Sequence, residues 1–406
     1  MGSPGPELQR QANRAAVLQV LADGTPRPVT VLRSATALSR QTLETILTEL
    51  VGEGWLEVAE VTGGAGAGRP ARQYALRPSA GYVAGVDVGV GKVLVVVADL
   101  TGSERTRVRT ELAPGATGRQ RRTALRSAIT AATASLGLTP DTLLGIAGGV
   151  PGIVDATGAI ARSVVVPEWV GADFGVELSG WAGCPVELAN DANLALLAEH
   201  WTGVAQGARD VVYLLAGVRT RAAIMINGAV HLGRHGAAGE VGSVPQLFFD
   251  TPHVLLGPRH GVRTDVAGVF GRAARGGSAA RARVDAFCTA LAQTISTLAL
   301  VLDPDLVVIG GGVSRAGAVL RDGVVNRLAT DVVAPLQLSG LGEEAVALGA
   351  VRHALAAAAR SRPALAAIVG ATPPPIRPAA IRTAPIRTAP IRPAPICSPT
   401  TSKDQP

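Results

Sequence analysis

Short β-branched and aliphatic runs alternate with longer helical segments from residue 82 to about residue 310, and this alternation constrains the fold most strongly. VAGVDV and KVLVVVADL are joined by a tight turn from Gly89 to Gly91, which predicts a hairpin. Strands are also expected in TRVRTEL, LLGIAGG, PVELA, DVVYLLA, AAIMING and DLVVIGGG, and helices near residues 119–136, 191–202 and 284–302. This order is typical of an α/β architecture with two lobes and a ligand cleft between them.

The N-terminal segment has helical periodicity first and strand-like runs afterwards. Helices are expected over residues 10–22, over about 29–36, and after Ser39, whose hydroxyl makes it a good N-cap. The core side of the third helix holds Leu43, Ile46, Leu47, Leu50 and Val51. A hairpin with a glycine-rich tip carrying Arg69 and Arg72 should follow. Three helices and a basic wing predict a winged helix-turn-helix over residues 1–79.

The polar side of the third helix carries groups that reach base edges and phosphates from a helix N-terminus. The residues expected to contact double-stranded DNA are Ser39, Arg40, Gln41, Thr42, Glu44 and Thr45, with Arg69 at or near the minor groove. An αα-hairpin used only for packing is the alternative that this pattern leaves open.

Composition and charge narrow the class of protein. Hydrophobic residues make up 47% of the 406 residues and charged residues 17%, which is a globular composition. No uninterrupted apolar run approaches the ~20 residues that span a bilayer, and the N-terminus lacks a signal-peptide pattern. Three scattered cysteines make neither a disulfide framework nor a metal-spaced pair. We therefore expect a cytoplasmic protein that does not enter a membrane.

The C-terminal segment repeats itself as IRPAA, IRTAP, IRTAP and IRPAP. Proline every few residues prevents helices and sheet ladders, so residues 363–406 are expected to be a disordered tail. Most of the chain's net charge of +7 lies there. A partner-docking arm and a dispensable solvated extension are both open interpretations.

Five separated motifs carry a family resemblance: AGVDVGVGK, GVPGIVDATGAI, ELANDANLALLAEHW, HGAAGEVG and DPDLVVIGGGVSRAG. In this order, behind a winged helix, they resemble the ROK family of repressors, open reading frames and kinases. The resemblance covers about residues 10–360. It implies a two-lobed, actin-like and ribonuclease-H-like effector domain over residues 80–362, and a homodimer.

The resemblance also implies a sugar site. In ROK sugar kinases the Asp of the NDAN motif is the general base, and Asp191 occupies that position here. Glu240 matches a sugar-contacting Glu of the family, and Asn190, Asp191 and Glu240 are expected to hydrogen-bond sugar hydroxyls. A capping role at the start of a helix would also explain Asn190 and Asp191, and both roles can hold at once.

The phosphate loops depart from the kinase pattern. The family's first motif reads Asp, any residue, Gly, Gly, Thr, whereas this chain has Val90 and Gly91 at its last two positions. The second loop, Gly-Thr-Gly-Ile-Gly in kinases, has become residues 217–221, with Arg219 and Arg221. Side chains now stand where phosphate should meet backbone N–H groups. We therefore expect no ATP cofactor and no kinase activity, with Asp191 as a vestigial base, although either arginine could bind phosphate instead.

The family's structural zinc should be missing as well. Ser243 occupies the position of the zinc-binding His, and VLLGPRHGVRT, the counterpart of the cysteine region, contains no Cys. No metal site is expected, and the family's second sugar-contacting Glu is replaced by Thr264.

The sequence therefore predicts a DNA-binding transcriptional regulator, a repressor, with a degenerate, sugar-responsive effector domain. The alternatives are an ATP-dependent sugar kinase with an attached DNA-binding domain, and a regulator that responds to a protein partner through its tail.

Overall fold

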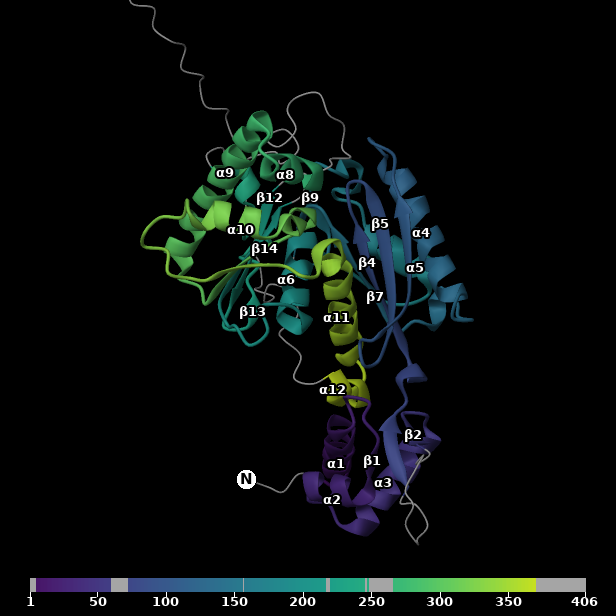
Figure 1. Cartoon of the computed structure of the whole chain (residues 1–406). Helices are drawn as coiled ribbons and strands as arrows, with labels where there is room; N and C mark the ends of the chain where they lie inside the picture. Colours follow the sequence, from purple (N-terminus) through teal and green to yellow (C-terminus); the bar gives the residue numbers. More distant parts are fainter. Residues whose placement is uncertain are drawn as a thin grey trace, which may run out of the picture.

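The computed structural model describes residues 5–59, 72–155, 157–216, 220–244, 247 and 266–369. Figure 1 shows a small N-terminal part at one end of an elongated molecule and a larger α/β body at the other. The chain passes from one to the other through the short helix η1 (Pro78–Ala80).

The N-terminal part contains three helices and a small antiparallel sheet in the order β1-β3-β2. Its elements are α1 (Pro6–Val20), β1 (Arg27–Pro28), α2 (Val29–Thr36), α3 (Arg40–Gly52), β2 (Leu56–Ala59) and β3 (Gln73–Leu76). Ser39 caps α3 as expected, because its side chain accepts a hydrogen bond from the Thr42 backbone N–H at 3.1 Å. The first helix begins earlier than expected, since Pro6 fits a first helical turn.

The predicted disordered tail starts too early. Residues Pro363–Val369 form a helix, α12, and its Leu365 and Ile368 are buried in one hydrophobic cluster with Leu18 of α1. Proline is tolerated at the start of a helix, and the apolar residues that follow can pack. Placing these residues in the tail was therefore wrong, and residues 370–406 lie outside the described part of the chain.

The N-lobe is built on a five-stranded sheet in the order β10-β7-β4-β5-β6. The strands are β4 (Tyr82–Val88), β5 (Lys92–Asp99), β6 (Glu104–Glu111), β7 (Gly145–Val150) and β10 (Val186–Asn190). Helices α4 (Gly118–Ala134) and α5 (Phe174–Ala182) pack on one face, and α11 (Ala345–Ala359) packs on the other. A two-stranded hairpin of β8 (Ile153–Val154) and β9 (Ile160–Arg162) lies beside this sheet.

The C-lobe has a second five-stranded sheet in the order β13-β12-β11-β14-β15. Its strands are β11 (Val211–Ala216), β12 (Thr220–Ile226), β13 (Ala229–Val230), β14 (Leu306–Gly310) and β15 (Leu336–Leu338). Helix α6 (Asp191–Thr202) covers one face, while α8 (Val266–Ala274), α9 (Ser278–Leu302) and α10 (Ala318–Val325) cover the other. The predicted α/β architecture with two lobes is confirmed.

Within the described residues, α9 alone is long and apolar enough to cross a membrane by length and composition, and half of its apolar window is buried in the protein. Phe287, Leu291 and Ile295 lie in the C-lobe core against β11 and β14. We interpret α9 as a core helix.

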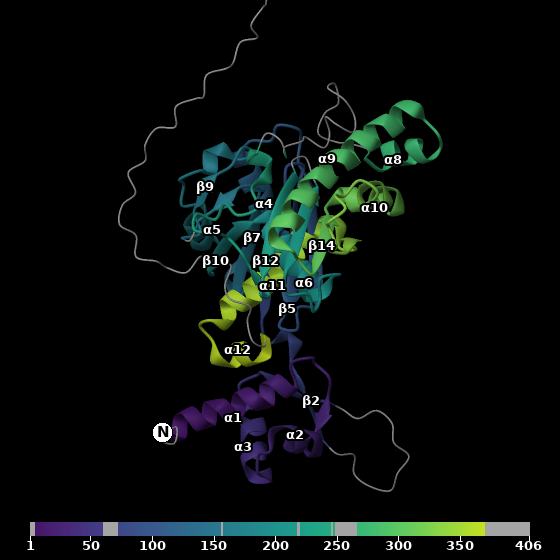
Figure 2. The ribbon, with the colours of Figure 1, turned by 90° about the vertical axis from the view of Figure 1, so that its left-hand side faces the viewer.

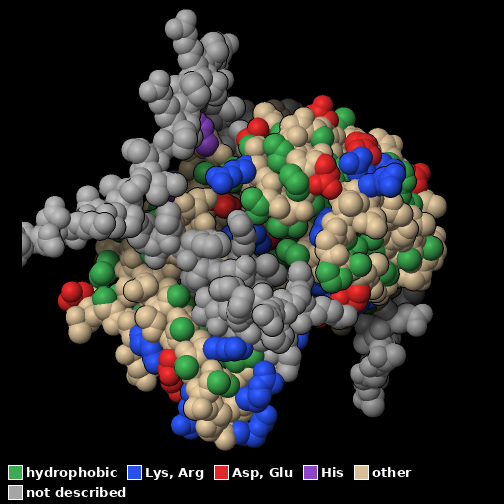
Figure 3. Space-filling view, turned by 90° about the horizontal axis from the view of Figure 1, so that it is seen from above, with side chains coloured by type: hydrophobic (Ala, Val, Ile, Leu, Met, Phe, Trp, Pro, Cys, Tyr) green, Lys and Arg blue, Asp and Glu red, His purple; other side chains and the backbone are tan. Residues whose placement is uncertain are grey.

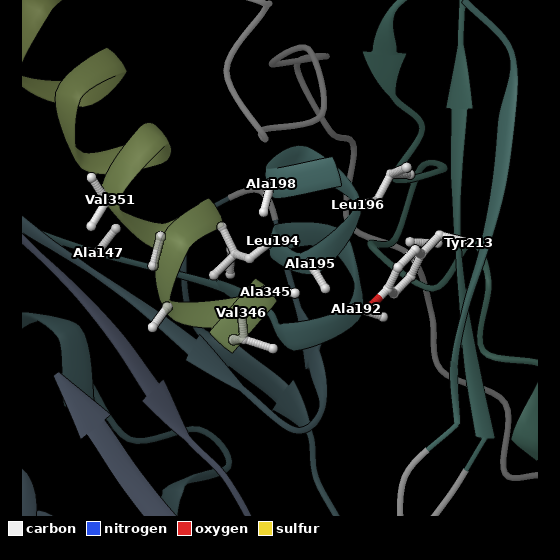
Figure 4. Packing of buried hydrophobic residues seen from close by; sticks show 14 of the residues in the cluster. Ala147, Ala192, Leu194, Ala195, Leu196, Ala198, Tyr213, Ala345, Val346 and Val351 are labelled. Atoms are coloured by element: carbon white, nitrogen blue, oxygen red, sulfur yellow. The ribbon is translucent and has the colours of Figure 1, made fainter. Parts of the chain in front are cut away.

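Two helices, α6 and α11, lie between the two sheets and touch along much of their length. Figure 4 shows the small side chains at this contact, among them Ala195, Ala198 and Ala345, around Leu194 and Val346. Short side chains let two helix backbones approach closely. Figure 2 shows α11 continuing downward into α12, which lies next to α1.

Candidate functional site

The structure brings together the three residues predicted to bind a sugar. Asn190 ends β10 and caps α6, with its side-chain oxygen accepting the Asn193 backbone N–H at 3.1 Å. Its Nδ2 donates to the Gly152 carbonyl oxygen at 2.9 Å and lies 3.4 Å from Glu240 Oε1. Asn190 is therefore the N-cap of α6, as the alternative interpretation required, whereas Asp191 is the first residue of the helix.

Asp191 is buried, and its carboxylate is already occupied by a cation. Oδ1 accepts the Ala192 backbone N–H at 2.8 Å, and Oδ2 forms an ion pair with Nη2 of Arg221. Burial raises the pKa of Asp191 to about 6, although the positive charge of Arg221 opposes this rise. Arg221, from the predicted second phosphate loop, thus pairs with the carboxylate that was predicted to occupy the position of the kinase base.

A second internal ion pair lies in the segment predicted to resemble the first phosphate motif. Lys92 Nζ lies 3.3 Å from Asp87 Oδ2 and donates to the Glu343 backbone carbonyl at 2.6 Å. Burial raises the pKa of the Asp87 carboxyl, and Lys92 opposes this rise. Lys92 therefore ties the β4–β5 turn to η6 (Gly342–Glu344), the turn that precedes α11.

The second phosphate loop is described only in part. Residues 217–219, and with them Arg219, lie outside the described residues, whereas Thr220 and Arg221 begin β12. Arg221 pairs with Asp191, so the expectation that it binds phosphate in place of the loop stays a prediction.

The cavity around Glu240 measures about 40 Å³. Its lining includes Pro151, Gly152, Arg162, Ser163 and Ser243. A space of this size holds a few water molecules. A sugar ring can enter only if the residues of the two lobes move apart.

Only one end of the predicted zinc region lies among the described residues. Ser243 ends η4 (Val241–Ser243), while residues 254–264, including Thr264, lie outside the described part of the chain. Across the residues that the structure describes, no three His, Cys, Asp or Glu side chains are grouped as metal ligands. The absence of zinc stays a prediction.

The predicted DNA-contacting residues lie on one side of α3, opposite the N-terminal core. Ser39, Arg40, Gln41, Glu44 and Thr45 are exposed. Arg40 Nε pairs with Glu44 Oε1 at 2.8 Å at the surface. Thr42 differs, because it is half-buried and its hydroxyl lies 2.8 Å from that of Ser39.

Arg69, which was predicted to lie in the wing, is among residues 60–71, outside the described ranges. Arg72, the residue before β3, is exposed.

A group of arginines lies where α8 meets α9, at the end of the molecule away from α3 (Figures 1 and 2). Figure 3 shows basic side chains on this projecting end. The arginines are Arg272, Arg275, Arg281 and Arg283. Their distance from α3 separates them from the predicted DNA face.

Sequence reasoning missed the buried cations of the cleft. Lys92 is the one lysine before the tail, and its position directly after the Gly89 to Gly91 turn was the available signal. Arg121 of α4 gave no signal, because only the fold brings it to the same turn, where its guanidinium donates to the carbonyls of Gly89 and Val90.

Comparison with known proteins places this geometry in a family. The ROK family model matches residues 83–255 and 256–357. A xylose repressor from Caldicellulosiruptor bescii is 26% identical over 246 residues, which are 60% of this chain and 61% of that protein. A glucokinase from Halalkalibacterium halodurans is 30% identical over 213 residues, 44% of this chain and 64% of that protein. The chain thus spans about three fifths of the length of these curated relatives.

Solved structures agree on the fold. A ROK family transcriptional regulator, a homologue of the E. coli MLC protein, has a TM-score of 0.64 at 18% identity and covers 89% of this chain and 98% of its own. A ROK family glucokinase from Streptomyces griseus in complex with glucose and AMPPNP has a TM-score of 0.57 at 23% identity. The match covers 67% of this chain and 98% of that protein's chain. The family match spans well over half of the sequence, and the chain belongs to the ROK family.

Proposed function

We propose that this protein is a DNA-binding transcriptional repressor whose ROK domain binds a sugar-like effector and does not phosphorylate it. The observation that carries the proposal is the exposed polar side of α3, with Arg40, Gln41 and Thr45, behind the Ser39 cap. An α-helix of this kind, beside a small antiparallel sheet, is the reading element of a winged helix-turn-helix. The likeness to a ROK transcriptional regulator over 89% of the chain supports this interpretation.

The cleft supports the loss of kinase activity. Phosphoryl transfer depends on positioning the phosphates and on a base that is free to accept a proton. Here Arg221 pairs with Asp191 and Lys92 pairs with Asp87. Both carboxylates therefore already have internal cationic partners.

A contact route connects the cleft to α3. Asn190 and Asp191 begin α6, which packs on α11, and α11 leads into α12. Helix α12 packs against α1, and Arg14 of α1 pairs with Glu49 of α3 and with Glu53, the C-cap residue of α3. A ligand that separates the lobes would shift α11 and hence the position of α3.

We further propose a cytoplasmic homodimer. Two α3 helices would then occupy successive major-groove half-sites about one DNA turn or a small multiple apart. Effector binding would change this spacing and release the operator.

Fluorescence anisotropy with a DNA fragment from upstream of the protein's own gene tests the proposal. Arg40→Ala should weaken binding and reduce its salt dependence, because one cation that meets DNA is removed. The control is Arg321→Ala, a surface arginine of α10 that pairs with Asp322. Equal binding by both variants and by the unmodified chain would contradict the placement of α3 on DNA.

A sugar kinase with an attached DNA-binding domain is the second candidate. It is favoured by the position of Asp191 at the start of α6, beside Asn190 and Glu240. It predicts sugar-dependent ATP hydrolysis that Asp191→Asn abolishes, whereas the repressor proposal predicts none in either chain.

A further inference from the structure

A second, larger cavity adjoins the predicted sugar site. It measures about 470 Å³ and lies between the β4–β5 turn at Val90, the start of α4, and the segment that includes Glu168. Val164 and Arg221 line both this cavity and the small one beside Glu240. A ligand in one can therefore extend into the other past Arg221.

Arg121 lines this cavity as a buried cation. It is 2% exposed, and its two terminal nitrogens donate to the backbone carbonyls of Gly89 and Val90. Its Nε has no hydrogen-bond partner. Within the ranges that the structure describes, no carboxylate lies within 4.0 Å of this guanidinium. A buried charge without a counter-ion is costly, and a bound anion would remove that cost.

Arg221 also lines this cavity, and most of its hydrogen-bond donors have no acceptor among the described residues. A guanidinium carries five N–H groups. Among the described residues only Asp191 accepts from Arg221, and the Arg221 Nε is buried without a partner. Two guanidinium groups thus border one space, and planar guanidinium groups favour phosphate and carboxylate oxygens.

Glu168 is the carboxylate that lines this cavity, and it is engaged elsewhere. Its Oε1 accepts the Gly118 backbone N–H at the start of α4. Hydrogen bonds from backbone N–H groups lower the pKa of Glu168, so it is ionised at neutral pH. Its charge reaches Arg121 only at longer range, where it favours the charged form of the guanidinium.

We propose that this cavity binds the anionic group, a phosphate or a carboxylate, of a sugar-like effector whose hydroxyls lie at Asn190 and Glu240. This inference rests on the proposed effector-binding function of the cleft. It makes Arg121 and Arg221 the residues that select charged over neutral sugars.

Isothermal titration calorimetry of the full-length chain tests the inference, with inorganic phosphate as the first probe. The variant is Arg121→Gln, and the matched control is Arg119→Gln, an exposed arginine on the same helix that does not line the cavity. We expect at least tenfold weaker phosphate binding in the Arg121 variant and unchanged binding in the control. Arg121→Lys, which keeps the charge, should bind phosphate better than Arg121→Gln, and this comparison guards against a loss caused by misfolding.

Glucose, glucose 6-phosphate and glucuronate distinguish the two anion sources. Tighter binding of glucose 6-phosphate than of glucose assigns a phosphate, and tighter binding of glucuronate assigns a carboxylate, provided that Arg121→Gln removes the difference. Absent binding of phosphate, glucose 6-phosphate and glucuronate, or equal binding of them by the Arg121→Gln variant and the unmodified chain, overturns the inference. So does Mg-ATP binding in preference to all of these probes.

DNA binding measured on the same preparations separates this inference from the proposed function. Specific DNA binding without an Arg121-dependent anion site supports the proposed repressor function and contradicts the proposed anion site. An Arg121-dependent anion site in a chain that binds no specific DNA supports the anion site and contradicts the proposed repressor function.

Discussion

Gly349 of α11 lies so close to α6 that a Cβ at this position would be 1.8 Å from the carbonyl oxygen of Leu194. No side chain other than hydrogen fits there. The two helices therefore touch through their backbones at this point. Because no flexible side chain separates them there, a displacement of α6 at the cleft would also displace α11.

Gly349→Ala should destabilise the protein by about 2 kcal/mol or more, because α6 and α11 must separate to accommodate the methyl group. Gly180→Ala is the control, since Gly180 is also helical and has nothing within 4 Å of its Cβ position. Alanine there should be neutral or slightly stabilising. Urea denaturation measures both changes, and equal stability of the two variants would contradict the close packing of α6 on α11.

Arg221→Ala should raise the pKa of Asp191 above its value of about 6. The variant removes the positive charge that favours the carboxylate and leaves the burial that disfavours it. NMR titration of the labelled aspartate carboxyl carbons measures the shift. Arg162→Ala, at the edge of the same cavity, is the control and should leave this pKa unchanged. An unaltered titration in the Arg221 variant would show that the ion pair does not form.

Glu187 should make stability depend on acid. Burial raises its pKa, but hydrogen bonds from His353 and Arg360 outweigh burial and lower the pKa from 4.5 to about 2. A folded-state pKa below the unfolded value gives stability that is fully present above pH ~4.5 and is lost as the pH falls toward 2, by about 3 kcal/mol.

The Glu187→Gln variant should therefore lose less stability than the unmodified chain between pH 5 and pH 3. Glu177→Gln, which removes an exposed carboxylate paired with Arg122 and Arg126, is the control and should follow the unmodified chain. Denaturant titrations at the two pH values measure the effect. Parallel acid losses in all three proteins would exclude this role for Glu187.

Truncation should locate the boundary of the folded chain. A protein ending at residue 362 loses α12, and with it the buried Leu365 and Ile368, so its unfolding free energy should fall by about 3 kcal/mol. A protein ending at residue 369 keeps this helix and should be as stable as the full chain. Thermal unfolding distinguishes them, and a stable protein ending at 362 would mean that α12 does not support the N-terminal part.

The local features were predictable because they depend on neighbours in sequence. The Ser39 cap, the apolar side of α3 from Leu43 to Leu50, and the strand before Asn190 all follow from short-range patterns. Helix α12 was missed because the proline repeats that follow it dominated the composition of the segment.

The ion pairs of the cleft could not be predicted in the same way. Arg221 and Asp191 are thirty residues apart, and their contact depends on how β12 faces the start of α6. Arg121 reaches the β4–β5 turn only because α4 packs across the N-lobe sheet. Such pairings depend on tertiary packing, and the spacing of the residues along the chain does not predict them.

The most direct test of the repressor account is a fluorescence-anisotropy titration of the full-length protein with DNA from upstream of its own gene, beside a scrambled duplex, at two salt concentrations. The account predicts an affinity at least about a thousandfold higher for the upstream DNA than for the scrambled duplex. Equal, weak and steeply salt-dependent binding to both duplexes would contradict it, because that behaviour reflects charge alone.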